Sequence, residues 1–275
     1  MNEQFIPGNW LTDTVEVLLV GAGGTGSRIL EQLLCLHRAI LAKGHPCGLH
    51  VTVVDMDTVS ESNIGRQAFY PSDVGSFKSH TLVNRVNMAM GGEYMWRAAT
   101  DCITEKSDLS RFDLVIGAVD NRKARQSIFK ALSKQRRHDR TFWLDFGNRS
   151  GDGQVVFGEV YGRDRKPSKS RLPHVGDLYP ELLDPSLEQE DDTPSCSLAE
   201  ALERQELYIN QAVSVQGMNI LWQLFTRGTI KVHGAFINLD QSTVMPLRVD
   251  PDEWARFGYG PKAKRVRKAT ASAQK

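Results

Sequence analysis

Two stretches of the chain carry residues suited to chemistry on a nucleotide. A glycine-rich turn, residues 21–26 (GAGGTG), directly follows an apolar run. The second stretch begins at Asp55 and contains Arg66 and Lys78. Glycines let backbone approach phosphate closely, and an acid ending a strand can bind ribose hydroxyls. Arginine and lysine neutralise phosphate oxygens, so these residue types together predict a nucleotide site with cations over its phosphates.

The glycine turn matches the pattern G-x-G-x-x-G through Gly21, Gly23 and Gly26, with Gly24 as an extra glycine. The pattern is weak alone, but here it follows a predicted strand and opens a predicted helix, which favours phosphate binding. A tight turn needed only for packing is the alternative. Asp55 supports the nucleotide interpretation, although a helix cap or a surface carboxylate would also explain it.

The cations point to chemistry on a triphosphate rather than to hydride transfer. Arg66 offers a planar fork for phosphate oxygens, and Lys78 offers a compact point charge. When a carboxylate attacks an α-phosphate and pyrophosphate leaves, such cations stabilise the developing charge. Asp120 ends a predicted strand and is suited to bind magnesium. Taken singly, each is explained equally well as a surface charge, so the prediction rests on their occurrence around one sheet edge.

The elements that must position these residues alternate between strand and helix in the first half of the chain. Apolar runs predict strands at 15–20, 49–54, 94–100, 113–119 and 141–146. Helical spacing of apolar residues predicts helices at 26–43, 76–90 and about 121–136, and residues 57–75 are polar and predicted as loop. This order predicts an α/β fold with a doubly wound, mostly parallel, Rossmann-like sheet.

The pattern changes after residue 150. A strand is predicted at 153–161 without a following helix, then a long loop at 162–195 and a long helical stretch at 197–227. Residues 229–239 and 243–249 predict C-terminal antiparallel strands that extend the sheet. We therefore expect one domain, residues 1–261, with a crossover loop at about 162–196, and a basic, disordered tail at 262–275.

Composition and charge indicate which partners and which cellular compartment to expect. The net charge is +1, so neither nucleic acid nor a membrane surface is expected as a partner, and the basic tail is more often a solvated terminus than a binding segment. No apolar run is long enough to span a membrane, and the four cysteines form no C-x-x-C pair. A reducing cytoplasm is expected. Cys35 and Cys102 are expected to be packing residues, and His174 and His233 structural ones.

Five ordered motifs carry a family resemblance: residues 21–26, Asp55-x-Asp57-x-Val59, Ser62-Asn63-x-x-Arg66-Gln67, Gly75-x-x-Lys78 and Asp120-Asn121. Together they resemble the adenylation domain of the ThiF/MoeB/ubiquitin-activating-enzyme superfamily, and within it most nearly the ThiF family of the bacterial PRTRC system. The resemblance covers residues 15–160 well and the remainder more loosely.

The resemblance implies a reaction and its residues. ATP and a protein carboxylate would give an acyl adenylate and pyrophosphate, the carboxylate being the C-terminus of a small ubiquitin-like (β-grasp) protein. Asp55 would bind ribose, and Asp120 would hold Mg²⁺. The phosphates would be contacted by Asn63, Arg66 and Lys78. The full nucleotide-binding set implied is Gly21, Gly23, Gly24, Gly26, Asp55, Asn63, Arg66, Gln67 and Lys78. A homodimer or pseudodimer is also implied.

The chain departs from the family in two respects, and one cysteine stays open. Some members supply an arginine from an N-terminal segment, whereas the first arginine here is Arg28, and the paired-cysteine zinc site of others is missing. Activating enzymes often pass the adenylate to a crossover cysteine. Cys196 fits that role because residues 197–200 (SLAE) form a capping box that puts it before a helix N-terminus. An inert thiol at a helix start is the alternative.

Two other functions stay open at this point. A nicotinamide-dependent oxidoreductase on the same fold would bind NAD(P) and would make Arg66 and Lys78 dispensable. A non-catalytic scaffold would bind a β-grasp protein without activating it, but the intact acid, arginine and lysine argue against such decay.

Overall fold

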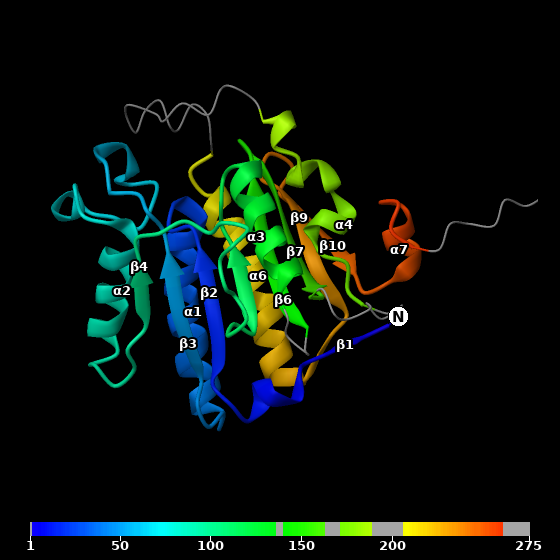
Figure 1. The fold of residues 1–275 in the computed structure, drawn as a ribbon, viewed down its shortest axis with the longest axis horizontal. Helices are drawn as coiled ribbons and strands as arrows, with labels where there is room; N and C mark the ends of the chain where they lie inside the picture. The colour runs from blue at the N-terminus through cyan, green and yellow to red at the C-terminus, as the bar shows by residue number, and fades with distance from the viewer. Residues whose placement is uncertain (1, 136–139, 163–170, 189–205, 261–275) are drawn as a thin grey trace, which may run out of the picture.

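The computed structural model of the chain describes residues 2–135, 140–162, 171–188 and 206–260. Its centre is an eight-stranded sheet with helices on both faces (Figure 1). The strand order is β10-β9-β7-β6-β5-β2-β3-β4. The strands are β2 (Val15–Val20), β3 (Leu49–Val54), β4 (Arg97–Ala99), β5 (Leu114–Gly117), β6 (Thr141–Asn148), β7 (Asp152–Val160), β9 (Val232–Asn238) and β10 (Thr243–Arg248).

One half of the sheet is parallel and deeply buried. β4, β3, β2, β5 and β6 run in the same direction, so their carboxyl ends meet at one edge. The apolar runs of β2 and β5 suit strands covered on both faces. Crossovers between these strands contain α1 (Gly24–Ala42), α2 (Lys78–Ala89) and α3 (Arg122–Lys134).

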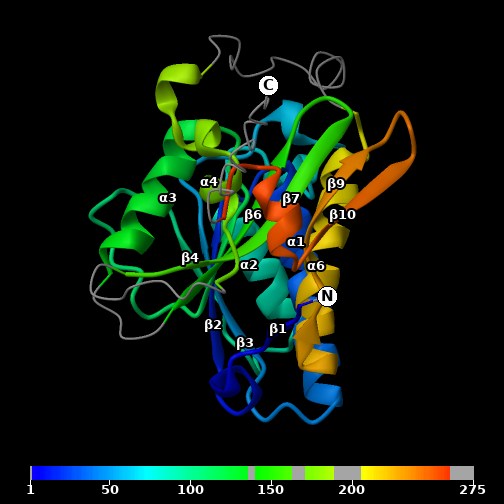
Figure 2. The same ribbon diagram turned by 90° about the vertical axis from the view of Figure 1, so that its right-hand side faces the viewer.

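The other half of the sheet is antiparallel. β6 turns back into β7, which pairs with β9, and β9 pairs with the edge strand β10. α6 (Ile209–Arg227) packs against β6, β7 and β9 and lies beside α1. Figure 2 shows α1, α2 and α6 on one face of the sheet and α3 and α4 (Val175–Leu178) on the other. A short sheet of β1 (Gln4–Phe5) and β8 (Thr229–Ile230), and the helix α7 (Pro251–Ala255), complete the described elements.

The structure confirms the predicted fold class and the antiparallel C-terminal extension. The strands predicted at 15–20 and 49–54 have the bounds of β2 and β3. Residues 57–75 contain only two single-turn helices, Glu61–Asn63 and Pro71–Asp73. Among the described residues, no helix is both long and apolar enough to cross a bilayer.

The prediction of a plain loop at 162–195 is wrong for its described part. Residues 171–188 contain α4 and two further turns of helix, Pro180–Leu183 and Pro185–Leu187. Leu172, Val175 and Leu178 are buried, because this segment packs against α3 and β7 and closes that face of the sheet. The abundance of proline and charge in the segment masked these few apolar positions.

The helix predicted at 197–227 begins only at Ile209: residues 206–208 are coil and turn, so the prediction is wrong for them, and residues 197–205 lie outside the described residues. The tail predicted at 262–275 and Cys196 also lie outside the described residues.

Candidate nucleotide site

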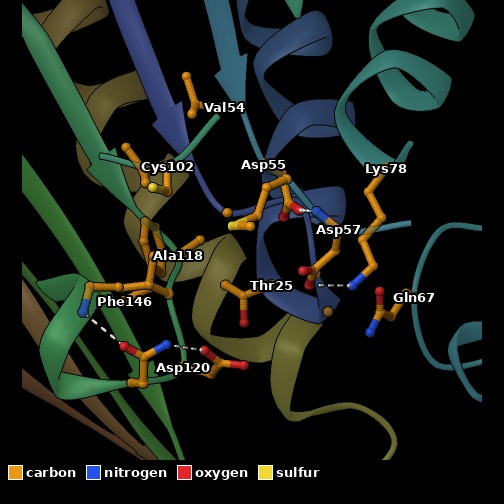
Figure 3. Close-up of a pocket in the computed structure, with 18 of the residues that line it drawn as sticks. Thr25, Val54, Asp55, Asp57, Gln67, Lys78, Cys102, Ala118, Asp120 and Phe146 are labelled. Atoms are coloured by element: carbon orange, nitrogen blue, oxygen red, sulfur yellow. Dashed lines mark hydrogen bonds and ion pairs between the residues drawn. The ribbon is translucent and has the colours of Figure 1, made fainter. Parts of the chain in front are cut away.

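A cavity of about 320 Å³ lies at the edge where the parallel strands end. Its walls come from the glycine turn, the ends of β3 and β5, the start of α2 and the first turn of α6 (Figure 3). The volume is within the range of small-molecule sites, and the position is where doubly wound sheets bind ligands. Of the residues predicted to act, the cavity is lined by Gly21, Gly23, Gly24, Asp55, Arg66, Gln67, Lys78 and Asp120.

The four glycines of the turn differ in function. Gly21 has φ +93°, and a side chain there would collide with the Ala118 carbonyl group. A side chain at Gly26 would collide with the Gly21 carbonyl oxygen, so Gly26 lets α1 pack against the turn, and it does not line the cavity. Gly23 has no atom within 4 Å of a would-be side chain, so its backbone faces open space. Gly23 therefore leaves room beside its backbone for a phosphate.

Asp55 ties the glycine turn to the end of β3. The Ala22 amide donates to Asp55 Oδ2 at 2.6 Å, and the Asp57 amide donates to Asp55 Oδ1 at 2.8 Å. Burial raises the pKa of the Asp55 carboxyl, and the two amides oppose that shift. Each carboxylate oxygen keeps a lone pair, so Asp55 can still accept a hydroxyl from a ribose.

Lys78 is the first residue of α2, and its side chain is largely buried. Lys78 Nζ lies 3.1 Å from Asp57 Oδ2, and the Lys78 amide donates to the Asp57 carbonyl at 2.9 Å. Asp57 is exposed, so the ammonium group of Lys78 lies between the solvated carboxylate of Asp57 and the cavity (Figure 3). The stem of Lys78 is held while its charge stays beside the cavity.

The turn after Glu61–Asn63 presents Arg66 and Gln67. Asn63 Oδ1 accepts the Ser60 amide at 3.0 Å, and the Asn63 carbonyl accepts the Gln67 amide at 3.0 Å. Asn63 thus shapes the turn and does not line the cavity. Burial lowers the pKa of Arg66, and the carboxylate of Asp120 opposes that shift.

Gln67 provides a direct test of fit for a polar ligand. It lines the cavity, it is 6% exposed, and its Oε1 atom is buried without a hydrogen-bond partner. An unpaired buried carbonyl is costly, and a donor on a bound molecule would remove that cost. A nucleotide supplies such donors through its hydroxyl and amino groups.

Asp120 follows β5 and points its exposed carboxylate to the cavity. Asn121 Nδ2 donates to Asp120 Oδ1 at 3.1 Å, and Asn121 Oδ1 caps α3 by accepting the Ala124 amide at 2.8 Å. In the ranges that the structure covers, no three His, Cys, Asp or Glu side chains form a metal-binding group. A divalent cation here would take most of its ligands from phosphate and water, as Mg²⁺ does with nucleotides.

Sequence reasoning missed a buried ion pair under the cavity. Arg125 Nε donates to both oxygens of Asp145 at 3.0 Å, and its Nη2 donates to the Val119 and Phe146 carbonyls at 3.1 Å. Burial raises the pKa of Asp145 to about 6, against the opposing charge of Arg125. The pair therefore ties α3 to β6 and to the loop that follows β5. The signal available in the sequence was Arg125 on the inward face of the predicted helix.

The cysteines differ from expectation. Cys35 and Cys102 are exposed, so their assignment as packing residues is wrong. Cys35 lies on the outer side of α1, and Cys102 lies on the cavity wall near Val54 and Ala118 (Figure 3). The structural role of His174 and His233 is confirmed, since both are buried and hydrogen-bonded.

A scan of protein families matches residues 11–252 to the ThiF family. The chain belongs to the ThiF family. The match extends past the parallel half of the sheet and takes in α6, β9 and β10.

Curated proteins similar to this chain activate ubiquitin-like modifiers, according to their names. Ubiquitin-activating enzyme E1 1 of Schizosaccharomyces pombe is 32% identical over 124 residues, which is 42% of this chain and 12% of that protein. The Nedd8-activating enzyme E1 catalytic subunit of Drosophila melanogaster is 29% identical over 146 residues, 50% of this chain and 28% of that protein. The chain thus spans well under a third of the length of these relatives.

Among solved structures, the chain is similar to E. coli tRNA N6-threonylcarbamoyladenosine dehydratase, TcdA, in complex with ATP. The identity is 23% and the TM-score 0.35, over 42% of this chain and 45% of that one.

Proposed function

We propose that this protein catalyses the ATP-dependent adenylation of the C-terminal carboxylate of a small, ubiquitin-like β-grasp protein. The observation that carries the proposal is the convergence of Asp55, Arg66, Lys78 and Asp120 on one cavity behind the glycine turn. A dehydrogenase that binds ribose through one acid does not need two further cations and a second acid around its phosphates. Membership of the ThiF family and the names of the curated relatives support the same reaction.

Each residue has a defined part in this reaction. Asp55 accepts ribose hydroxyls, and the amides of the glycine turn bind phosphate oxygens. Arg66 and Lys78 balance the charge that develops on the α-phosphate and on departing pyrophosphate. The attacking oxygen belongs to the carboxylate of the partner, its bond to phosphorus forms as the bond to pyrophosphate breaks, and no proton has to be removed. Catalysis therefore requires positioning and charge, which these side chains supply.

Magnesium fits the site as a companion of the triphosphate. Asp120 is the carboxylate that would hold it, and the ion would supply further positive charge along the phosphates. We also propose that the Cys196 thiolate then attacks the carbonyl carbon of the acyl adenylate, which forms a thioester and releases AMP. The protein would act as a homodimer in the cytoplasm. Membership of the PRTRC branch of the family stays a prediction.

Nucleotide binding separates this function from a nicotinamide-dependent oxidoreductase. Binding of ATP, NADH and NADPH to the full chain would be measured by calorimetry, with Lys78→Met and, as a matched control, the exposed Lys106→Met. We expect ATP to bind, Lys78→Met to weaken it at least about tenfold, and Lys106→Met to match the wild type, since a charge-assisted phosphate contact contributes about 1.5–3 kcal/mol. Tight NADH binding with ATP ignored would overturn the proposal.

Exchange of labelled pyrophosphate into ATP then tests the chemistry. The exchange would be measured with a panel of purified β-grasp proteins and with the same proteins lacking their C-terminal glycine. We expect exchange with an intact member of the panel and none with its truncated form or with Asp120→Ala. ATP binding without exchange for any partner would favour the scaffold.

A further inference from the structure

The carboxamide of Asn210 joins three parts of the chain at the cavity. Asn210 lies on the first turn of α6, is 2% exposed and lines the cavity. Its Oδ1 atom accepts the Thr25 hydroxyl at 2.9 Å and Asn148 Nδ2 at 2.9 Å. Thr25 belongs to the first turn of α1, and Asn148 ends β6. One buried oxygen thus connects the phosphate-binding turn to the C-terminal half of the protein.

Gly24 provides an independent sign that the start of α1 is shaped around Asn210. A side chain at Gly24 would lie 2.7–2.9 Å from the carboxamide atoms of Asn210. The extra glycine of the turn is therefore explained by the close approach of α6 rather than by a phosphate. The two helices stay in contact farther along, where Gln32 Nε2 donates to Ser214 Oγ at 3.2 Å.

The consequence of this contact for phosphate binding follows from its position. The first-turn amides of α1 are the donors that a phosphate meets, and a small displacement of these donors weakens every hydrogen bond they make. Thr25 is one of the first residues of that turn, and its hydroxyl has a buried acceptor only while Asn210 stays in place. Loss of the acceptor leaves the buried Thr25 hydroxyl and the half-buried Asn148 amide without this partner, so the turn must shift for the Thr25 hydroxyl to reach water.

We propose that Asn210 is a positioning residue for the triphosphate: it holds the first turn of α1 where its amides meet the phosphates. This inference rests on the proposed function, because it assumes that ATP occupies the cavity. It gives α6 a role in the affinity for phosphate and none in the affinity for the nucleoside. α6 lies outside the part of the chain that carries the nucleotide motifs.

The test compares ATP with adenosine. Dissociation constants of both would be measured for the full-length wild type, Asn210→Ala and Thr25→Val. We expect both variants to weaken ATP at least about tenfold and adenosine less than about twofold. Thr25 and Asn210 share one hydrogen bond, so the double variant should bind ATP no more weakly than the single variant with the larger loss. Independent effects on the dissociation constant would multiply. Thr25→Val keeps the shape of the side chain and serves if Asn210→Ala fails to fold.

Asn210→Asp and Gln32→Ala sharpen the result. The aspartate keeps an oxygen acceptor but adds a negative charge, so the loss of affinity should grow from adenosine to AMP, ADP and ATP. Gln32→Ala removes a hydrogen bond between the same two helices away from the cavity and should leave the ratio of ATP to adenosine affinity unchanged.

The outcomes are distinguishable. Equal losses for ATP and adenosine in Asn210→Ala, multiplied effects in the double variant, or a Gln32→Ala effect equal to that of Asn210→Ala would overturn the positioning role while the adenylation proposal stands. Failure of the wild type to bind ATP would overturn both.

Discussion

Replacement of Asp55 by asparagine tests the geometry that joins the glycine turn to the sheet. Asp55 accepts the Ala22 amide through one oxygen and the Asp57 amide through the other, at 2.6 Å and 2.8 Å. Asparagine has a single side-chain oxygen, so whichever way its amide is turned, an NH₂ group faces a backbone N–H. One charge-assisted hydrogen bond is lost, and the NH₂ group of the asparagine faces a second N–H donor.

The expected loss is about 1.5–3 kcal/mol of unfolding free energy, the usual contribution of a hydrogen bond to a charged group. For a chain of this size it corresponds to a fall in Tm of roughly 3–12 °C. Urea unfolding and calorimetry would measure both. Asp101→Asn is a matched control on the same cavity, because exposed Asp101 accepts only the neighbouring Cys102 amide, at 2.7 Å, and its loss should cost less than about 0.5 kcal/mol.

A second measurement, on Asp55→Ala, tests the ribose contact. The wild type should bind ATP about 10–100-fold more tightly than 2′,3′-dideoxy-ATP, whereas Asp55→Ala should bind the two nucleotides equally. An unchanged preference in Asp55→Ala would refute the ribose assignment. Wild-type stability in Asp55→Asn would refute the account of the turn itself.

Three further predictions concern the frame of the site. Burial lowers the pKa of His233 to about 4, so neutral His233 stabilises the fold fully above its unfolded pKa of 6.5, and this contribution is lost as pH falls towards 4. Between pH 7.5 and 5, urea unfolding should therefore report a loss of about 2 kcal/mol of unfolding free energy. That loss should be missing in His233→Gln. Arg125→Met should cost about 3–5 kcal/mol in the same assay because it leaves Asp145 buried without its cation, and Asp145→Asn in the same chain should recover part of that loss. Gly26→Ala should cost about 1–3 kcal/mol through its collision with the turn, whereas Gly23→Ala should cost less than about 1 kcal/mol and instead weaken ATP binding by calorimetry.

The parallel half of the fold could be predicted because its signals are local. β2 and β3 are short apolar runs, the first followed by a glycine and the second by an acid, and each strand ends directly before that residue. The segment 171–188 could not be predicted in the same way. Its buried residues, 172–175 and Leu178, form a run too short to show a helical period, so nothing local indicates that they pack against α3 and β7.

The candidate site divides along the same line. Asp55, Lys78 and Asp120 follow directly from strand ends and helix starts, and all three line one cavity as expected. Arg125 and Asp145 were missed because a buried ion pair is defined by two side chains far apart in the sequence, with nothing in either segment to indicate the other. The exposure of Cys102 was missed because a residue after a short strand can face either the core or the cavity.

The glycine turn changes most in meaning when the whole chain is considered. The motif alone suggests four glycines serving a phosphate, but Gly21 and Gly26 let the turn pack on itself and on β5, and Gly24 admits Asn210. The family match through residue 252 includes α6, whereas the recognisable nucleotide motifs end near Asp120. Since the buried partner of Thr25 comes from α6, the glycine turn and the start of α1 are held in part by the C-terminal half of the chain. This contact argues that the candidate nucleotide site and the antiparallel half of the sheet form one structural unit rather than two independent halves.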